Sequence, residues 1–351
     1  MQYQKWLNEW FENYARPTLK DRTYERYLAV AEDHIIPHVG EAELEKMTPS
    51  LLQHFITALL KSGNLKTGEG LAPNSVNIVI SVLKNSLREA CNLGLTAEPL
   101  GDKIKRPRTN EKKVECFSTS EQKMIEAAVK KEEKDKLFGV ILCLYTGLRI
   151  GELLALEWDD MDLLSGELRV SRSCHDSKDH MGKYCRKTDL PKTSASYRTV
   201  PLPHQLLPLL HTLKKRSDTV YVVSEGGEPV SVRSYQRSFE LLLQKYRLPH
   251  HGFHALRHTF ATRALECGMD VRTLSEILGH RNPTVTLRRY AHSFDEHKRE
   301  MMNRVGDLLT PQGGGESRML LSLDHYKKKG QENPADFCPF DAFDGIGRNY
   351  E

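Results

Sequence analysis

Apolar residues in the first hundred positions recur at helical spacing. The stretch "TYERYLAVAEDHIIPHVG" carries one apolar face and is expected to end near Pro37 and Gly40. In "TPSLLQHFITALLKSG", Thr48 is the predicted N-cap, and the proline that follows it suits the first helical position. "LAPNSVNIVISVLKNSLREACNLG" predicts a long amphipathic helix. These patterns predict a helical domain at residues 1–102.

A second set of elements begins at Ser118, which forms a predicted capping box with Glu121. The apolar helix "KDKLFGVILCLYTG" and the short helix "LRIGELLALEWDDMD" follow. The period then changes, because "GELRVSRS" and "SYRTVPLP" alternate like strands around a polar stretch of about 20 residues. Helical spacing returns in "PHQLLPLLHTLKKR", "SYQRSFELLLQKY", "HALRHTFATRALECG" and "VRTLSEILGH", and again in "DEHKREMMNRVGDLL".

The predicted fold class is therefore mainly α with one small antiparallel β-sheet, in two domains. The second domain is expected at 118–310, and a linker at 103–117 separates it from the first. The segment 311–351 opens on glycines and has little periodicity, so we expect a disordered tail.

Composition and charge narrow the function only slightly. A hydrophobic content of 39% and a charged content of 28% are typical of globular proteins, and 351 residues suffice for two domains. The net charge of +4 permits nucleic-acid binding without requiring it. Residues 1–102 hold 10 lysines and arginines against 13 aspartates and glutamates, so the positive charge lies elsewhere.

The linker is the basic segment. "KIKRPRTNEKK" has six cations and one acid, and it is either a solvated tether or a contact for DNA. The candidate DNA-binding cations are Lys103, Lys105, Arg106, Arg108, Lys112 and Lys113.

The sequence gives little support for a membrane protein, a secreted protein or a metalloprotein. No apolar run approaches the roughly 20 residues that cross a bilayer, and "MQYQKWLNEWFENYARP" contains no signal core, so a cytoplasmic protein without membrane contact is expected. The seven scattered cysteines do not predict disulfides. Cys174, His175, His180 and Cys185 match no standard zinc spacing, and we predict neither a metal nor a cofactor.

The stretch "LGHRNPTVTLRRYAHS" sets Tyr290 among cations, with Arg288 and Arg289 before it and His280 ten positions upstream. Cleavage of a phosphodiester without a metal needs a nucleophile, cations on the non-bridging oxygens and a proton donor for the leaving 5′ oxygen. A tyrosine can attack phosphorus, arginines grip phosphate oxygens, and lysine or histidine moves protons.

The remaining candidates each have a simpler explanation when taken alone. Arg149 in "TGLRIGELLAL" fits a surface arginine at a helix boundary, and Lys192 in "PKTSASYR" fits a solvated loop lysine. His254 and Arg257 lie one helical turn apart on one face, whereas His258 is expected on a neighbouring face as a core or supporting residue. His280 follows a glycine that is typical of a helix C-cap.

Together, "TGLRIGELLAL", "HALRHTFATRALECG", "LGHRN" and "TLRRYAH" resemble the tyrosine recombinase (phage integrase) family over residues 1–308. The resemblance implies a site-specific DNA recombinase that cleaves and rejoins strands through a 3′-phosphotyrosyl intermediate, without a metal. Glu152 matches the acidic position that supports the site, and Lys187 is a rival for Lys192. The catalytic residues that the resemblance implies are Arg149, Lys192, His254, Arg257, His280 and Tyr290.

The resemblance also implies a helical core-binding domain that forms a C-shaped DNA clamp with the catalytic domain. The expected partners are double-stranded DNA at recombination sites and three further copies of the chain, in a tetramer where the last helix, 295–309, docks onto a neighbour. Arg288 and Arg289 are either DNA-backbone contacts or packing residues.

Two alternatives remain open at this point. A type IB topoisomerase uses the same chemistry as a monomer and would relax DNA without paired sites. A DNA-binding regulator would explain the helix-turn-helix resemblance of "VRTLSEILGHRNPTVTLRRY", but it has no need of Arg149, His254, Arg257 and Tyr290 together.

Overall fold

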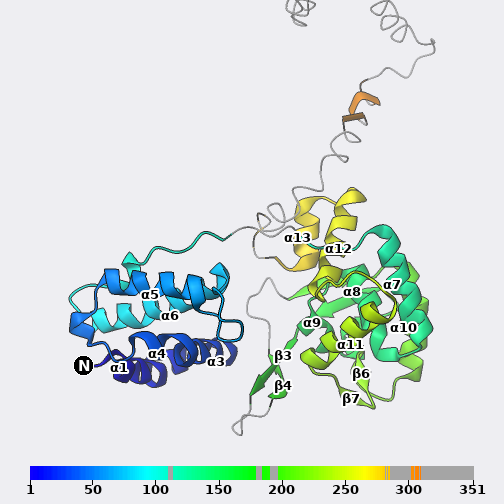
Figure 1. Ribbon diagram of the computed structural model, residues 1–351. Coiled ribbons are helices and arrows are strands. Elements are labelled where there is room, and N and C mark those ends of the chain that lie inside the picture. The colour runs from blue at the N-terminus through cyan, green and yellow to red at the C-terminus, as the bar shows by residue number, and fades with distance from the viewer. Residues whose placement is uncertain are drawn as a thin grey trace, which may run out of the picture. The chain divides into compact units, whose positions relative to one another are not determined.

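The structure is a computed structural model of the chain, and it describes residues 1–109, 114–178, 184–189, 197–280, 282, 284, 302, 303, 305–307 and 309. Met1–Phe294 form one compact unit and Asp295–Glu351 a second. Within the first unit the buried apolar residues fall into three separate clusters: one over residues 3–104, a second and larger one over residues 117–256, and a small third one over residues 261–278. Figure 1 shows the corresponding helices in blue to cyan and in green to yellow.

The first cluster is all helical. Its elements are α1 (Tyr3–Trp10), η1 (Phe11–Ala15), α2 (Arg16–Thr18), α3 (Asp21–Val30), η2 (Ala31–Ile35), α4 (Ile36–Val39), η3 (Leu44–Lys46), α5 (Pro49–Ser62), α6 (Pro73–Asn92) and η4 (Leu100–Lys103). The long helix α6 lies at its centre, where the buried Ser86 hydroxyl meets Tyr3 Oη at 2.7 Å and the Ser86 carbonyl accepts from Trp6 Nε1 at 3.0 Å. Thr48 caps α5 as predicted, because its hydroxyl accepts from Leu51 N.

Prolines inside the first helices are accommodated by wider turns. The π-helical segments η1 and η2 precede α2 and α4, each of which carries a proline near its start. A proline lacks the N–H that an α-helix needs and its ring clashes with the carbonyl four residues back, and a π turn relieves both. The predicted helix end near Pro37 and Gly40 is confirmed, since α4 continues through Pro37 to Val39, with Gly40 as C-cap.

The linker predicted at 103–117 is anchored at both ends. Ile104 is buried in the first cluster and Phe117 in the second. Phe117 N also donates to Thr259 Oγ1 at 2.9 Å. The exact domain boundaries remain a prediction.

The described part of residues 117–280, which contains the second cluster and the small third one, mixes helices with short strands. Its elements are α7 (Thr119–Glu132), η5 (Asp135–Leu137), α8 (Phe138–Thr146), α9 (Ile150–Leu154), η6 (Trp158–Asp160), β1 (Met161–Asp162), β2 (Glu167–Val170), β3 (Ser173–Lys178), β4 (Tyr184–Asp189), β5 (Arg198–Pro201), η8 (His204–Leu206), α10 (Leu207–Arg216), β6 (Ser224–Glu225), β7 (Glu228–Pro229), α11 (Val232–Lys245), α12 (His254–Glu266) and α13 (Val271–Leu278). The capping box of Ser118 and Glu121 at α7 is confirmed.

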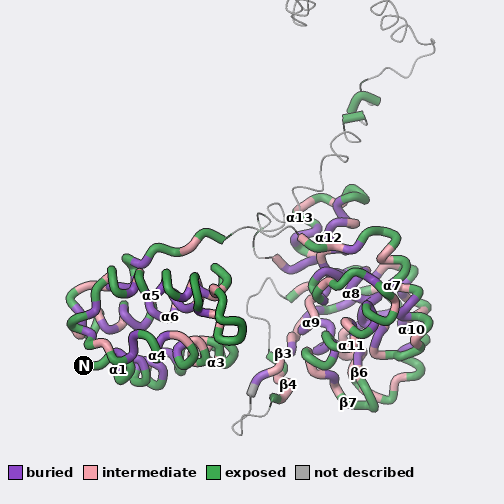
Figure 2. Tube along the Cα trace, in the orientation of Figure 1, coloured by how far each residue is buried: buried purple, intermediate pink, exposed green. Residues whose placement is uncertain are grey.

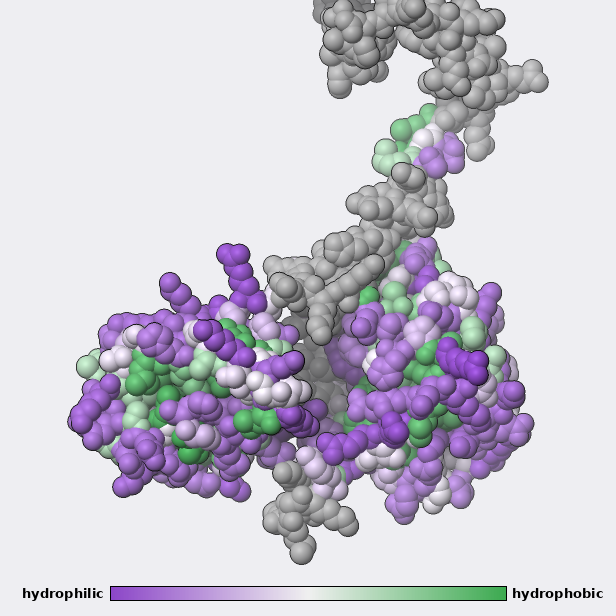
Figure 3. Space-filling view, in the orientation of Figure 1, coloured by the Kyte–Doolittle hydropathy of each residue, from purple (hydrophilic) through white to green (hydrophobic). Residues whose placement is uncertain are grey.

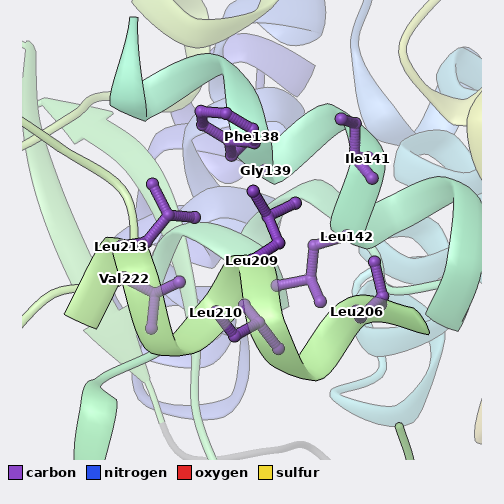
Figure 4. A pocket seen from close by; sticks show the side chains of 9 residues that line it. All are labelled: Phe138, Gly139, Ile141, Leu142, Leu206, Leu209, Leu210, Leu213 and Val222. Atoms are coloured by element: carbon purple, nitrogen blue, oxygen red, sulfur yellow. The ribbon is translucent and has the colours of Figure 1, made fainter. Parts of the chain in front are cut away.

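Helix α8 is buried on almost every side, which explains why its sequence is apolar all round (Figure 2). Beside it, an apolar depression between α8 and α10 is lined by Leu142, Leu206 and Leu210 among others (Figure 4). Its free volume is about 10 Å³, no more than a single water needs, so it is a packing defect and not a ligand pocket. Hydrophilic residues cover most of the visible surface around both clusters (Figure 3).

The mainly α fold with small antiparallel sheets is confirmed. The predicted strands pair in a sheet of order β1-β2-β5, in which Val170 lies opposite Arg198. In the polar stretch between them, β3 and β4 form an antiparallel ladder, from Ser173 opposite Asp189 to Lys178 opposite Tyr184. A third small pair joins β6 and β7.

In the described part of the chain no helix is long and apolar enough to cross a membrane. The described residues of the predicted last helix, 302, 303, 305–307 and 309, are helical, and Met302, Val305 and Leu309 are exposed. The predicted tail at 311–351 lies outside the described residues.

Candidate active site at the C-terminal end of α13

Three arginines meet at the C-terminal end of α13. The last carbonyl oxygens of a helix have no partner within it, and they carry the negative end of its dipole. Three consecutive carbonyls at this end each accept a hydrogen bond from a different guanidinium group. Those of Ile277, Leu278 and Gly279 bind Arg198, Arg257 and Arg149, in that order, at 2.6, 2.8 and 3.1 Å. One helix end thus gathers side chains from β5, from α12 and from the start of α9.

Glu152 joins two of these arginines. Its carboxylate accepts from Arg149 Nη1 at 2.7 Å and from the Arg149 backbone N at 2.9 Å. It also accepts from Arg198 Nη1 at 3.1 Å and Nη2 at 2.8 Å. Burial alone would raise the pKa of Glu152, but the hydrogen bonds and charge of Arg198, followed by those of Arg149, hold that pKa at about 2. The carboxylate is therefore ionised at neutral pH, with Arg149 fixed beside it.

Arg198 was not predicted from the sequence as a site residue. Arg198 ends the stretch "PKTSASYR", which was considered only for Lys192, although the Arg198 side chain is just 6% exposed. A signal was available in the strand pattern, because residues two apart share a face and Val200 is buried. An arginine on the inward face of a short strand needs a buried partner, and Glu152 is that partner.

Arg257 is buried, with 2% of its surface exposed. In addition to Leu278 O, it donates to Gly147 O at 2.8 Å and contacts His280 Nε2 at 2.8 Å. A guanidinium group can only donate, so His280 Nε2 is the acceptor and the imidazole proton lies on Nδ1.

Glycines permit both turns that frame Arg257. Gly147 has a φ of +66°, and a Cβ there would lie 2.5 Å from Phe260 Cδ1. Gly279 has a φ of +64° and is the C-cap of α13, the position predicted for it. His280 follows directly, which is how its ring reaches Arg257.

His254 and His258 lie on the same face of α12. The structure places the two rings in contact, with centroids 4.5 Å apart and planes at 85°. The prediction that His258 occupies a neighbouring face was wrong, because residues four apart on a helix lie one above the other. His254 is exposed and His258 is half-buried.

The cluster carries excess positive charge. Arg149, Arg198 and Arg257 contribute three positive charges and Glu152 one negative charge, which leaves +2. Arg149, whose side chain is 38% exposed, is the most accessible of the three. A phosphodiester carries one negative charge and a pentacoordinate phosphorane carries two. The arrangement is therefore suited to bind phosphate and to stabilise its transition state.

Several predicted site residues lie outside the described part of the chain. They are Lys112, Lys113, Lys192, Arg288, Arg289 and Tyr290. The rival Lys187 is described, on β4, and its Nζ lies 3.0 Å from Asp21 Oδ2. Hydrogen bonding to that carboxylate raises the pKa of Lys187.

The described linker cations differ in their surroundings. Lys103 pairs with Glu98 at 2.5 Å. Arg106 donates to Asn77 O at 3.4 Å and to Ser81 Oγ at 3.3 Å, on α6. Lys105 and Arg108 are exposed.

The Cys174 region is organised as a strand ladder. Cys174 lies opposite Thr188, whereas Cys185 lies opposite Ser177, so the two thiols are not cross-strand neighbours. Over the described ranges, three or more histidine, cysteine, aspartate or glutamate side chains are nowhere grouped as a metal site would need.

Two families match the chain. The phage integrase family matches residues 117–297, and the phage integrase N-terminal SAM-like domain matches residues 2–60. A XerC-like tyrosine recombinase of Caldanaerobacter subterraneus subsp. tengcongensis is 30% identical over 329 residues, which cover 86% of this chain and 82% of that protein. The ICEBs1 integrase of Bacillus subtilis is 25% identical, with coverage of 83% and 79%.

Solved structures share the fold. The Tn1549 transposon integrase in complex with a circular intermediate DNA matches with a TM-score of 0.71 and 22% identity, over 87% of this chain and 99% of that one. A lambda integrase tetramer bound to a Holliday junction matches with a TM-score of 0.63 and 19% identity, over 82% and 77%.

Proposed function

Because this chain belongs to the phage integrase family, we propose that Tyr290 is the nucleophile of its recombination reaction and that the arginine cluster at α13 binds the phosphate under attack. Membership of the family makes the protein a tyrosine-type site-specific DNA recombinase, of the kind that mobile elements encode. Such an enzyme cleaves and rejoins DNA strands through a 3′-phosphotyrosyl intermediate. The assignment of individual residues is our proposal.

The cleavage step exchanges one phosphate ester for another. The phenol oxygen of Tyr290 forms a bond to phosphorus while the bond from phosphorus to the 5′ oxygen breaks. The phenol gives up a proton and the leaving 5′ oxygen takes one. Rejoining reverses these transfers with the 5′ hydroxyl of another strand, so that no external energy source is needed.

The proton transfers require a base and an acid. A histidine is mostly neutral near pH 7 and a lysine is charged. We therefore assign removal of the phenol proton to His254, which is exposed, and donation to the 5′ oxygen to Lys192. His258 supports His254 through the ring contact at 4.5 Å.

The arginines supply the electrostatic stabilisation. Arg149 and Arg257 are assigned to the non-bridging oxygens, with His280 beside Arg257 as a further hydrogen-bonding group. Glu152 holds Arg149 in place through its carboxylate. The observation that carries this proposal is the convergence of three guanidinium groups on one helix end with a net charge of +2.

The proposed partner is double-stranded DNA at recombination sites, gripped by a clamp of the helical and catalytic domains. The exposed linker cations, together with Arg288 and Arg289, are proposed DNA-backbone contacts. We also propose that the enzyme acts in the cytoplasm. We also propose a tetramer, as in the lambda integrase complex with a Holliday junction. The exposed apolar residues Met302, Val305 and Leu309 would let the last helix dock onto a neighbouring copy.

The test is Tyr290→Phe on a nicked suicide substrate, from which the released fragment diffuses away and traps the covalent adduct. The variant is expected to bind DNA as the wild type does and to form no adduct on a denaturing gel. Tyr246→Phe is the matched control, because the Tyr246 hydroxyl donates to Glu132, which is not part of the arginine cluster. Adduct at normal yield in Tyr290→Phe would refute the assignment.

A further inference from the structure

Arg198 is held by hydrogen bonds on every nitrogen of its guanidinium group. Its Nη1 and Nη2 donate to the two oxygens of Glu152, and its Nε donates to Ile277 O at 2.6 Å. The guanidinium group also lies against the Gly279 turn, since a Cβ on Gly279 would lie 2.9 Å from Nη1 and 3.2 Å from Cζ. The Arg198 side chain thereby fixes both the Glu152 carboxylate and the turn at Gly279.

We propose that Arg198 is a positioning residue for recombination, which fixes Arg149 through Glu152 and fixes His280 through the end of α13. The inference rests on the proposed function, because it concerns the same phosphate site. Each guanidinium nitrogen of Arg198 already donates to Glu152 or to Ile277 O, so Arg198 itself is not expected to touch DNA.

The geometry explains why Glu152 alone does not suffice. Arg149 contacts one Glu152 oxygen through Nη1 and the other through its backbone N, so a single hydrogen bond to Glu152 holds the Arg149 guanidinium group. Arg198 engages both oxygens at once, at 3.1 and 2.8 Å, and so fixes the carboxylate plane. Its third bond, to Ile277 O, ties that plane to the helix end from which His280 projects. Arg149 and His280 thus share one rigid support.

A lysine at this position would be an incomplete substitute. It keeps the charge, but an ammonium group cannot present the planar fork that meets both Glu152 oxygens and still reach Ile277 O. Arg198→Lys is therefore expected to fold and to misplace Arg149. A misplacement of about 1 Å near the reacting atoms lowers a catalytic rate by about 10²-fold.

Loss of Arg198 also predicts a new pH dependence. The groups that face Glu152 are Arg149 on its own element, Arg198 on β5 and the buried Cys143 thiol on α8, whose pKa is raised by burial. Without Arg198, Glu152 loses the strongest contribution that keeps it ionised, and its pKa must rise. Protonation would then release Arg149, so cleavage by the variant should fall as the pH is lowered through a range where the wild type is unaffected.

The experiment compares wild type, Arg198→Met, Arg198→Lys and Arg198→Met/Glu152→Gln. It measures the single-turnover rate of adduct formation on the suicide substrate from pH 5 to pH 8, single-site DNA binding, and thermal melting. We expect both single variants to bind DNA and to cleave about 10²-fold more slowly at pH 8. Both should also show an acid limb, which is a further fall in the cleavage rate as the pH is lowered. The double variant should be slow but without that limb, because glutamine does not titrate. Arg169→Met is the control, since Arg169 lies on β2 opposite Thr199 and is exposed.

Arg198→Lys at the wild-type rate, with a flat pH profile, would overturn the proposal. So would a slow Arg198→Met variant whose acid limb persists in the double variant, because the titrating group would then not be Glu152. If Arg198→Met does not fold, Arg198→Lys and the double variant decide between these outcomes. Tyr290→Phe is measured beside them: an adduct there would end the proposed function, whereas its absence with unaffected Arg198 variants would end only this inference.

Discussion

Replacing Glu152 by glutamine should destabilise the second domain in a pH-dependent way. The carboxylate is 6% exposed, and its pKa is about 2 in the fold against 4.5 as the reference value. A difference of about 2.5 units corresponds to about 3 kcal/mol of stability at neutral pH. The same order of magnitude, about 3–5 kcal/mol, is expected when one partner of a buried ion pair is removed.

The direction in which folding shifts the pKa of Glu152 determines how its contribution to stability depends on pH. The pKa of Glu152 is lowered by folding, so its stabilisation is complete above the unfolded pKa and is lost as the pH falls towards the folded pKa of about 2. Between pH 7 and pH 3 the wild type should lose about 2 kcal/mol through this group. Glu152→Gln lacks the contribution altogether, so the two curves should converge towards low pH.

The assay is urea unfolding at several pH values, followed peptide by peptide by hydrogen exchange. Peptides from α8, α9 and α13 report on the second domain. Peptides from α1 and α6 report on the first cluster and serve as an internal control that should not change. A stability difference below about 1 kcal/mol at pH 7, or one that stays constant down to pH 3, would refute the reasoning.

Metal independence, DNA binding by the linker and the role of the last helix can each be tested separately. Adduct formation on the suicide substrate should continue in EDTA, because the arginine cluster supplies the positive charge; cleavage that stops in EDTA and returns with magnesium would contradict this. Alanine at Lys105, Arg106 and Arg108 should reduce the slope of log K against log salt by about 0.9 for each phosphate that the linker no longer neutralises, whereas an unchanged slope would make the linker a solvated tether. Truncation after Ser293 should spare single-site binding and adduct formation but abolish strand exchange between two sites; a truncated protein that is unfolded, or one that recombines normally, would end the idea that the last helix acts on a neighbouring copy.

The sequence by itself determined the features that depend on neighbours along the chain. The capping box at Ser118, the N-cap at Thr48 and the helix end at Gly279 were all predictable, because caps and turns involve residues within four positions of each other. The contact between Arg149 and Glu152 belongs to the same class, since the two are three positions apart. The order of the motifs was enough to indicate the family, although Lys192 and Tyr290 keep their roles as proposals.

Only the tertiary structure decided which side chains share the site. Arg198 is 46 positions from Glu152 and 79 from Ile277, and its polar neighbourhood in the sequence resembles a solvated loop. The register of the ladder between β3 and β4 was also not predicted, because mostly polar strands lack the alternation that fixes pairing. The three arginines converge because the carbonyls at the end of α13 have no partners within the helix. The packing of the chain decides which donors reach these carbonyl groups, and no local sequence pattern encodes that choice.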